Sequence, residues 1–389
     1  MIDFTLTEDQ ETLRSTVADF ARSQVAPVIG DFYERGAFPY DIIAGMGKMG
    51  LFGLPFPEEY GGMGGDYFAL CLALEELARV DSSVAITLEA AVSLGAMPVY
   101  RFGSEDQKQH WLPQLCSGAA LAAFGLTEPG GGSDVPGGMR TTAELDRTAS
   151  PEGYWIINGS KSFITNAGTD LTQFVTVTAR TPDGGISTII VPAGTTGFAV
   201  GQKYSKVGWS ASDTRELSFT GVRVPAANLL GTQGKGYAQF LSILDEGRIA
   251  IAALAVGLAQ GCVDECLGYV PQREAFGRPI GHYQAIQFKI ADMEARTCAA
   301  RALYYVAAAR MLAGQPFKKE AAVAKLVASN AAMDNARDAT QIFGGYGFMN
   351  EFPVGRFYRD AKILEIGEGT SEIQRMLIAR HLGLPARAN

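Results

Sequence analysis

The chain has 389 residues, of which 47% are hydrophobic and 19% are charged, and its formal net charge at pH 7 is −8. A chain of this length buries a large apolar core and divides into roughly two or three domains. The net negative charge disfavours a nucleic-acid partner, because such a partner is held by a broad basic surface.

The start of the chain, Met-Ile-Asp-Phe, shows no basic segment followed by an apolar stretch. We therefore expect no signal peptide and a cytoplasmic protein. The apolar run Ile249–Leu258 is shorter than the roughly 20 residues that a membrane-spanning helix needs. We interpret it as part of a buried core helix and expect no membrane partner.

The cysteines and glycines contain no familiar cofactor motif. Cys262 and Cys266 would share one helix face, but no histidine is near them, so we expect apolar filler and no metal. The triglycine 130–132 lacks the third glycine of the dinucleotide fingerprint, so a nucleotide cofactor would bind without a Rossmann unit. The five cysteines are odd in number and widely spread: Cys71, Cys116, Cys262, Cys266 and Cys298.

The first 120 or so residues have apolar residues at helical spacing. Thr7 and Gln10 form the ends of a capping-box pattern, which predicts a helix start before a run that extends to Val25. A glycine-rich break at 61–65 separates two of the later segments. The further predicted helices cover Tyr40–Gly50, Tyr67–Val80, Ser83–Phe102 and Glu105–Cys116.

The pattern changes between about Leu121 and Leu230, where short β-rich segments recur at intervals of about ten residues with turn-forming residues between them. This spacing is typical of a small β-sandwich or barrel. The segments are Tyr154–Asn158, Phe174–Ala179, Ser187–Val191, Phe198–Val200 and Glu216–Val224.

From Gly236 to about Leu382 the sequence is helical again, with long Ala- and Leu-rich stretches. We therefore predict a multidomain α+β fold in which a β-domain lies between two helical domains. The predicted boundaries are 1–120, 121–232 and 233–389.

The segment Phe124–Asp134 is unusual because three glycines follow Pro129. Glycines leave backbone N–H groups free to approach an anion, and the hydroxyls of Thr127 and Ser133 lie on both sides. The alternative is a plain turn, although a turn rarely needs three consecutive glycines.

Phe163 and Thr165 lie in the segment Gly159–Asn166, which is predicted as a strand or strand end. Two residues apart on a strand, their side chains point to one face. An aromatic ring beside a hydroxyl suits a planar ligand, but Phe-x-Thr is also common on half-buried strands.

The segment Arg273–Ile280, followed by Gln284, places a fixed cation near a glycine. Such a cation suits phosphate recognition. A solvated loop between helices is an equally good interpretation of these residues alone.

Glu368 lies between Gly367 and Gly369, and Ser371 and Gln374 have capping-box spacing. These residues predict a break before a helix that starts near Ser371. A carboxylate there is favourable at the helix dipole. The flanking glycines also remove side-chain bulk, as a group that meets a substrate requires.

Five motifs in this order resemble the FAD-dependent acyl-CoA dehydrogenase family over essentially the whole chain. The family has an N-terminal helical domain, a middle β-domain and a C-terminal four-helix bundle. The motifs are Leu-Thr-Glu-Pro-x-x-Gly-Ser-Asp (126–134), Lys-x-Phe-Ile-Thr-Asn (161–166), Arg-x-x-Phe-Gly (273–277), Gln-x-Phe-Gly-Gly-x-Gly (341–347) and Tyr-Arg-Asp-Ala-Lys-Ile-x-x-Ile-x-Glu-Gly-Thr (358–370).

The resemblance implies an FAD site. Phe163 and Thr165 would cover the isoalloxazine, although many relatives have tryptophan where this chain has Phe163, so a donor is lost. Arg273, Phe276 and Gln284 would contact the diphosphate and adenosine. The resemblance also implies flavin-lining roles for Phe124, Leu126 and Thr127, a place at the flavin–pantetheine boundary for Ser133, contacts to a neighbouring subunit's FAD for Gln341, Gly344 and Gly345, and closure over FAD for Thr370 and Glu372.

A site shared between chains implies a homo-oligomer, usually a tetramer. By the same resemblance, Asp245, Arg248 and Gly369 lie on the substrate side, and an electron-transfer flavoprotein accepts the electrons. The pathways implied are fatty-acid or branched-chain amino-acid catabolism.

The implied reaction is α,β-dehydrogenation of an acyl-CoA thioester. Glu368 would remove the α-proton while the β-hydride passes to flavin N5. The backbone N–H of Glu368 and the ribityl 2′-hydroxyl of FAD would polarise the thioester carbonyl. Desolvation by the acyl chain should raise the pKa of Glu368.

Two alternatives remain from the sequence. Some family members carry the base on another helix, at the position of Gly247 here, whereas the neighbouring Glu246 should point about 100° away. A flavin oxidase or monooxygenase on the same fold is the other alternative. Residues 83–102 contain no arginine before Arg101, which disfavours a dicarboxylyl substrate.

Several relatives have a tyrosine where this chain has Gly367. Glycine would leave space beside the reacting carbons and permit bulk there. Alternatively, Gly367 only supplies the backbone freedom that breaks the helix.

Overall fold

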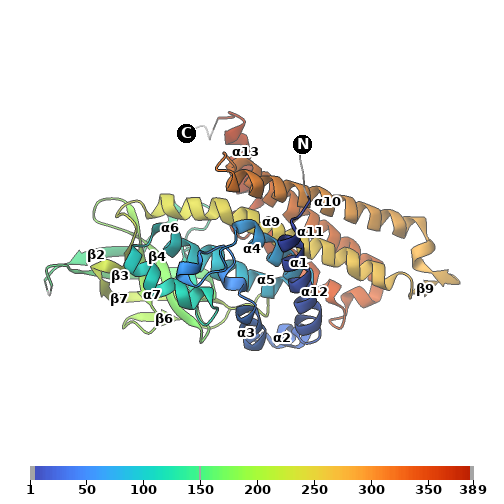
Figure 1. Cartoon of the computed structure of the whole chain (residues 1–389), viewed down its shortest axis with the longest axis horizontal. Helices are drawn as coiled ribbons and strands as arrows, with labels where there is room; N and C mark the ends of the chain where they lie inside the picture. The colour runs from blue at the N-terminus through green and yellow to red at the C-terminus, as the bar shows by residue number, and fades with distance from the viewer. Residues whose placement is uncertain (1–4, 149, 386–389) are drawn as a thin grey trace.

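The structure is a computed structural model that describes residues 5–148 and 150–385. A β-sheet lies at one end of an elongated molecule, and long helices extend from it to the other end (Figure 1). Helices from the N-terminal and the C-terminal parts of the chain pack together. The predicted order of helices, then strands, then helices is present.

The N-terminal part is helical, as predicted. Thr7 accepts a hydrogen bond from the backbone N–H of Gln10, and the Gln10 side chain accepts one from Thr7, which confirms the capping box. The helices are α1 (Glu8–Phe20), α2 (Ile29–Arg35), α3 (Tyr40–Lys48), α4 (Tyr67–Ala78), α5 (Ser82–Glu89), α6 (Met97–Phe102) and α7 (Glu105–Cys116), with π-helical turns at Ala21–Val25 and Ala90–Ala96 and 3₁₀ turns at Leu51–Gly53 and Glu58–Tyr60.

The middle part forms one eight-stranded sheet in the order β6-β7-β3-β2-β4-β5-β8, with β1 paired in parallel to β4. All five predicted β segments lie in this sheet, whereas β1, β2 and β8 were not predicted. The strands are β1 (Leu121–Gly125), β2 (Thr142–Asp146), β3 (Tyr154–Thr165), β4 (Thr172–Arg180), β5 (Ile186–Pro192), β6 (Phe198–Val200), β7 (Thr214–Pro225) and β8 (Leu229–Leu230), with the short helix α8 (Val135–Gly138) and a 3₁₀ turn at Ala226–Asn228.

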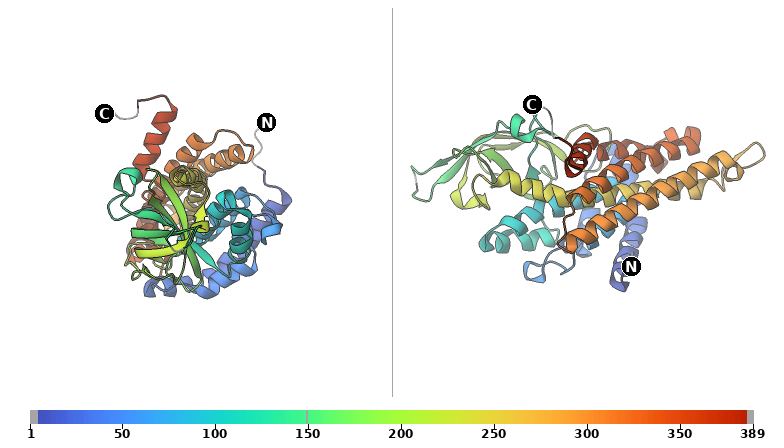
Figure 2. Two further views of the ribbon diagram at one scale, coloured as in Figure 1. Left: turned by 90° about the vertical axis from the view of Figure 1, so that its left-hand side faces the viewer. Right: turned by 90° about the horizontal axis from the view of Figure 1, so that it is seen from above.

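The C-terminal part consists of helices and one small hairpin. The three long helices α9, α10 and α11 lie side by side, and α12 and α13 pack on α11 (Figure 2). Their bounds are α9 (Gly236–Tyr269), α10 (Gln284–Leu312), α11 (Lys318–Phe343), α12 (Pro353–Leu364) and α13 (Ser371–His381), with the hairpin β9 (Glu274–Ala275) and β10 (Arg278–Pro279) and 3₁₀ turns at Ile280–His282 and Gly344–Phe348.

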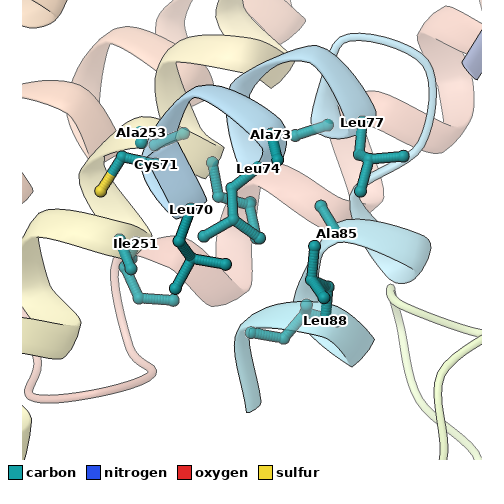
Figure 3. Close-up of a cluster of buried hydrophobic side chains, with 14 of the residues drawn as sticks. Leu70, Cys71, Ala73, Leu74, Leu77, Ala85, Leu88, Ile251 and Ala253 are labelled. Carbon is teal, nitrogen blue, oxygen red and sulfur yellow. The ribbon is translucent and has the colours of Figure 1, made fainter. Parts of the chain in front are cut away.

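The core joins the two helical parts. Leu70 and Leu74 of α4 and Leu88 of α5 pack beside Ile251 and Ala253 of α9 (Figure 3). Burying such apolar side chains contributes roughly 1.5–3 kcal/mol for each leucine or isoleucine. This packing holds α9, which carries several predicted site residues, against α4 and α5.

Two helical stretches, Ser82–Phe102 and Gly236–Tyr269, are long and apolar enough to cross a membrane, although most of their residues are buried inside the protein. The run Ile249–Leu258 lies within the 34-residue helix α9, so the length of the run alone does not decide between a core helix and a membrane span. Burial, rather than length, supports its interpretation as a core helix.

Candidate active site

Glu368 lies in the break that the sequence predicts, between the end of α12 at Leu364 and the start of α13 at Ser371. The backbone of Glu368 is left-handed, with φ of +50°, and Gly369 follows with φ of +94°. A left-handed backbone is strained for a residue other than glycine, and such strain clusters at functional sites.

The helix cap differs from the prediction by one residue. The N-cap is Thr370, whose hydroxyl accepts from the backbone N–H of Ile373 at 3.3 Å. Ser371 is already helical and therefore does not form a capping box with Gln374. Glu372 is exposed in the first turn, 3.7 Å from Arg375.

Two side chains that sequence reasoning missed hold the loop after Glu368. Lys325 of α11 donates to the carbonyl oxygen of Gly369 at 2.9 Å, and Gln374 donates to the same oxygen at 2.8 Å. Both side chains are fully buried. Burial lowers the pKa of Lys325 to about 8.

The carboxylate of Glu368 is shielded from solvent, and among the described residues no N–H group and no alcohol or phenol hydroxyl donates a hydrogen bond to it. Burial raises the pKa of Glu368, while the charges of Lys325 and Arg248 oppose that rise. Within the described part of the chain, the backbone N–H of Glu368 donates no hydrogen bond. The loop thus offers a desolvated base and a free donor side by side.

Helix α9 forms the wall that faces Glu368. A side chain at position 247 would contact Oε2 of Glu368, so Gly247 leaves room for that carboxylate. Glu246 turns away and accepts from Arg101 at 3.1 Å, as its position on the helix predicts. The alternative base position therefore faces the same site but has no side chain.

Asp245 and Arg248 form a buried ion pair on α9, one helical turn apart. Asp245 also pairs with Lys318 of α11 at 2.7 Å. The Nε of Arg248 is buried and has no hydrogen-bond partner among the described residues. This pair lies on the helix that faces Glu368, where the sequence predicted the substrate side.

The predicted flavin-lining residues of β1 and β3 come together at one end of the sheet. The ring of Phe124 stacks on Phe240 of α9, with centroids 3.7 Å apart. The carbonyl oxygen of Leu126 accepts from Lys161 at 3.2 Å, and that of Thr127 accepts from Ser162 at 2.9 Å. The two motifs therefore form one wall.

A buried ion pair fixes this wall. Lys161 Nζ lies 2.8 Å from Glu128 Oε1, and both side chains are nearly inaccessible to solvent. Glu128 also accepts from the backbone N–H groups of Arg140 and Thr141. Burial lowers the pKa of Lys161 to about 8, although Glu128 opposes the change. Both residues stand in the sequence motifs 126–134 and 161–166, but the motifs alone give neither residue a role.

One glycine of the triglycine, Gly131, is required by close packing. The N–H of Gly131 donates to the carbonyl oxygen of Glu128 at 3.0 Å, so it is not free for an anion. A Cβ on Gly131 would lie 2.8 Å from the Cα of Gly138. Ser133, in the same loop, is exposed.

Phe163 lies at a bulge where β3 changes register against β7 between Lys161 and Ile164. Its φ is +62° and its side chain is 66% exposed. Ile164 is buried and Thr165 is half-buried. An exposed phenylalanine ring held by a strained backbone is suited to contact a ligand.

A second group of predicted residues lies at the far end of α9. Arg273, Phe276, Gly344 and Gly345 line one cavity of about 750 Å³, and the Arg273 guanidinium lies 5.7 Å from the ring centroid of Tyr346. The neighbouring Gln284 and Gln341 are exposed. Phe276, 97% exposed, has a left-handed φ of +53° at the hairpin tip.

Arg273 and Gly344, both expected to contact FAD, line one cavity of one chain. Phe240, beside Phe124, and Tyr269, in the cavity, are separated by about 40 Å along α9. The cavity therefore lies far from the end of the sheet that carries Phe124.

Three matches to known domain families cover most of the chain. They are the acyl-CoA dehydrogenase N-terminal domain over residues 7–119, the middle domain over 123–222 and the C-terminal domain over 234–383. This chain belongs to the acyl-CoA dehydrogenase family.

Similar proteins cover the chain from end to end. The probable acyl-CoA dehydrogenase YngJ of Bacillus subtilis is 49% identical over 98% of this chain and 100% of its own length. Butyryl-CoA dehydrogenase of Megasphaera elsdenii has a TM-score of 0.93 at 43% identity, covering 98% of this chain and 100% of that one. A chain from structural work on the electron transferring flavoprotein of Acidaminococcus fermentans has a TM-score of 0.94 at 43% identity, covering 98% and 99%.

Acyl-CoA dehydrogenases depend on FAD, and the residues present fit this cofactor. The exposed ring of Phe163 offers a face for a flat heterocycle. A Cβ at Gly344 or Gly345 would meet nothing within 4 Å, so their backbones are open to a ligand. Arg273 supplies a cation in the same cavity, which suits a diphosphate.

Proposed function

We propose that this chain dehydrogenates short-chain acyl-CoA thioesters at the α and β carbons, with Glu368 as the base. The observation that carries the proposal is the buried carboxylate of Glu368. No described N–H group or alcohol hydroxyl hydrogen-bonds to it, and it faces Gly247 of α9. The proton goes to Glu368, and the product is the trans-2-enoyl-CoA.

An α-proton of a thioester becomes acidic only when its carbonyl oxygen is polarised by donors that stabilise the developing negative charge. The backbone N–H of Glu368 is a free donor on the same residue as the base. Lys325 and Gln374 anchor the carbonyl of Gly369 and so fix the orientation of this loop. One loop thus supplies the base and a donor in a fixed geometry.

Burial makes Glu368 a stronger base than a solvated carboxylate, because it raises the pKa of the carboxyl towards the working pH. A hydrogen bond with Glu89 and the charges of Lys325 and Arg248 oppose this rise. The cofactor FAD, when bound, accepts the β-hydride, while the protein supplies position and electric field.

We propose two groups of FAD contacts that come from different chains. Phe163 and Thr165 would cover the flavin ring, while Arg273 would bind the diphosphate of a neighbouring chain's FAD. The remaining proposed FAD contacts are Phe124, Leu126, Thr127, Ser133, Thr370 and Glu372 at the flavin end and Phe276, Gln284, Gln341, Gly344 and Gly345 at the cavity end. Such a shared site requires a homo-oligomer, which we propose to be a tetramer.

We propose that Asp245, Arg248, Ser133 and Gly369 contact the substrate. Relatives named short-chain specific acyl-CoA dehydrogenases and butyryl-CoA dehydrogenase support a short acyl chain and fatty-acid catabolism. The only arginine in residues 83–102 is Arg101, and Glu246 accepts its hydrogen bonds. A dicarboxylyl substrate therefore lacks a free cation in this segment.

The related chain from the work on the electron transferring flavoprotein supports an electron-transfer flavoprotein as the acceptor. We also propose that residues 1–120, 121–232 and 233–389 form the three domains and that the enzyme works in the cytoplasm. The alternative is a flavin oxidase on the same fold, in which oxygen takes the electrons.

The variant Glu368→Gln tests the base. The holoenzyme should retain FAD yet lose about 10²–10⁴ of the rate of flavin reduction by butyryl-CoA under anaerobic conditions. Glu246→Gln is the matched control and should keep most of the rate. Wild-type turnover in Glu368→Gln would refute the assignment, and peroxide formation in place of ferrocenium reduction would favour the oxidase.

A further inference from the structure

Glu89 is a carboxyl group buried beside the proposed base. It is the last residue of α5, is 0% exposed, and lies where the helix changes to the π-helical turn Ala90–Ala96. π-helical turns occur often at functional sites. Among the described residues, neither carboxyl oxygen of Glu89 has an ion-pair partner or accepts a hydrogen bond from an N–H group or an alcohol hydroxyl.

Glu368 is a polar neighbour of Glu89. The two carboxyl groups are within hydrogen-bonding reach of each other. A Cβ at Gly247 would contact Oε2 of Glu368 and lie 3.8 Å from Oε1 of Glu89, so both groups converge on one point of α9. Ser93, one turn later, hydrogen-bonds to Tyr67 at 2.9 Å, and it also opposes the rise in the pKa of Glu89.

Two carboxylates cannot both be ionised at such a contact, because the repulsion and the loss of hydration are both costly. If one of the two groups keeps its proton, it donates a hydrogen bond to the other, and an oxygen of each group then has a hydrogen-bond partner. Lys325 and Arg248 favour the charged form of Glu368, while no cation faces Glu89 in this cluster. The titratable and charged groups around the pair are Tyr67 and Cys71 on α4, Asp245, Glu246 and Arg248 on α9, and Lys325 on α11.

We propose that Glu89 is a positioning residue for the reaction: it is protonated in the resting enzyme, donates a hydrogen bond to Glu368, and thereby keeps the base ionised and oriented. This inference rests on the proposed role of Glu368. Burial and the charge of Glu368 raise the pKa of Glu89 well above its usual range. The hydrogen bond from Glu89 in turn lowers the pKa of Glu368 below the value that burial alone would give.

Two substitutions of similar size separate the hydrogen bond from the bulk of the side chain. Glu89→Gln keeps an N–H donor and cannot ionise, whereas Glu89→Met removes the donor. In the FAD-loaded enzyme, the acid limb of the pH profile for flavin reduction should move to higher pH in Glu89→Met by about one to two pH units. In Glu89→Gln this limb should stay near that of the wild type.

An infrared measurement tests the protonation state without turnover. The wild type should show a carbonyl band of a protonated carboxylic acid, and both Glu89 variants should lose it. A band that persists in Glu89→Gln would overturn the proposal, even if Glu89→Met does not fold.

The direction of the pH shift identifies the error if the proposal is wrong. If Glu89 is an ionised neighbour, removing its charge lowers the pKa of Glu368, and the acid limb moves to lower pH in both variants. If the pH profiles of both Glu89 variants coincide with that of the wild type, the carboxyl groups of Glu89 and Glu368 are not coupled. If Glu368→Gln loses activity but the acid limb of the pH profile is unshifted in both Glu89 variants, this inference alone is refuted. If Glu368→Gln keeps full activity, the proposed function is refuted.

Discussion

The carboxylate of Glu368 occupies the space that a side chain at position 247 would need. The two positions belong to segments far apart in the sequence, one in the middle of α9 and one in the loop before α13. Since two side chains cannot occupy this space, only one of the two positions can carry the base. In this chain the carboxylate in that space belongs to Glu368, which we propose as the base.

Gly247→Ala should separate activity from stability. The added methyl group displaces the Glu368 carboxylate, and a misplacement of about 1 Å costs about 10²-fold in rate. An alanine in a helix interior is otherwise favourable by about 0.5–1 kcal/mol. Gly268→Ala on the same helix is the control, because its Cβ would meet nothing within 4 Å. Stopped-flow flavin reduction and thermal unfolding measure the two effects, and unchanged kcat in Gly247→Ala would contradict the prediction.

Glu128→Gln should destabilise the wall formed by β1 and β3. Lys161 would remain buried without its ion-pair partner, and breaking a buried pair costs about 3–5 kcal/mol. The measurement is the free energy of unfolding, together with the FAD content. Adding Lys161→Met should restore part of the loss, because it removes the unpaired charge.

The control for this pair is Glu144→Gln, since Glu144 is exposed on β2. It should leave stability unchanged. Equal stability of Glu128→Gln and the wild type would show that the ion pair contributes nothing.

Arg273→Ala should weaken FAD retention and oligomer stability together. A ligand bound only by the assembled form stabilises the assembly, so loss of a phosphate contact affects both. Arg278→Ala is the matched control: its guanidinium lies 4.4 Å from the ring centroid of Tyr283, and it does not line the cavity. Full FAD content in Arg273→Ala after gel filtration at low concentration would count against the shared site.

The order of helices and strands follows from local sequence features, whereas the role of Glu368 as the base is implied by the resemblance to the family. Glu368 stands out because glycines flank it before a helix start, and the strands stand out by their turn residues. The Thr370 cap was missed by one residue, because Thr370 and Ser371 both have the side chain of an N-cap and only the backbone angles distinguish them.

The supporting residues were not predictable in the same way. Glu89 and Lys325 lie within apolar or alanine-rich helices, where a single charged residue has no local partner. Their roles depend on contacts between segments far apart in the chain, such as Lys325 with Gly369. Likewise, only the length of α9 shows how far the cavity lined by Arg273 and Gly344 lies from Phe240.

Gly367 bears on the shape of the acyl pocket. Its φ lies outside the left-handed region, so the break before α13 does not depend on glycine at this position. A Cβ there would meet only Ile363, with its carbonyl oxygen at 3.4 Å, and otherwise open space. The need for backbone freedom therefore does not explain the glycine at this position, and a larger side chain there would enter open space.

Gly367→Tyr should therefore narrow the substrate range. The ring would occupy the open space, and kcat/KM for branched or ring-bearing acyl-CoAs should fall more than that for butyryl-CoA. A pocket obtains about 1–3 kcal/mol of discrimination from small steric differences, which corresponds to about 10–200-fold in the ratio of kcat/KM values. Gly367→Ala is the control: it removes the backbone freedom of glycine without filling the space, and both substrates should react nearly as in the wild type. Equal losses on both substrates in Gly367→Tyr, repeated in Gly367→Ala, would show a backbone effect and remove the support for an open pocket.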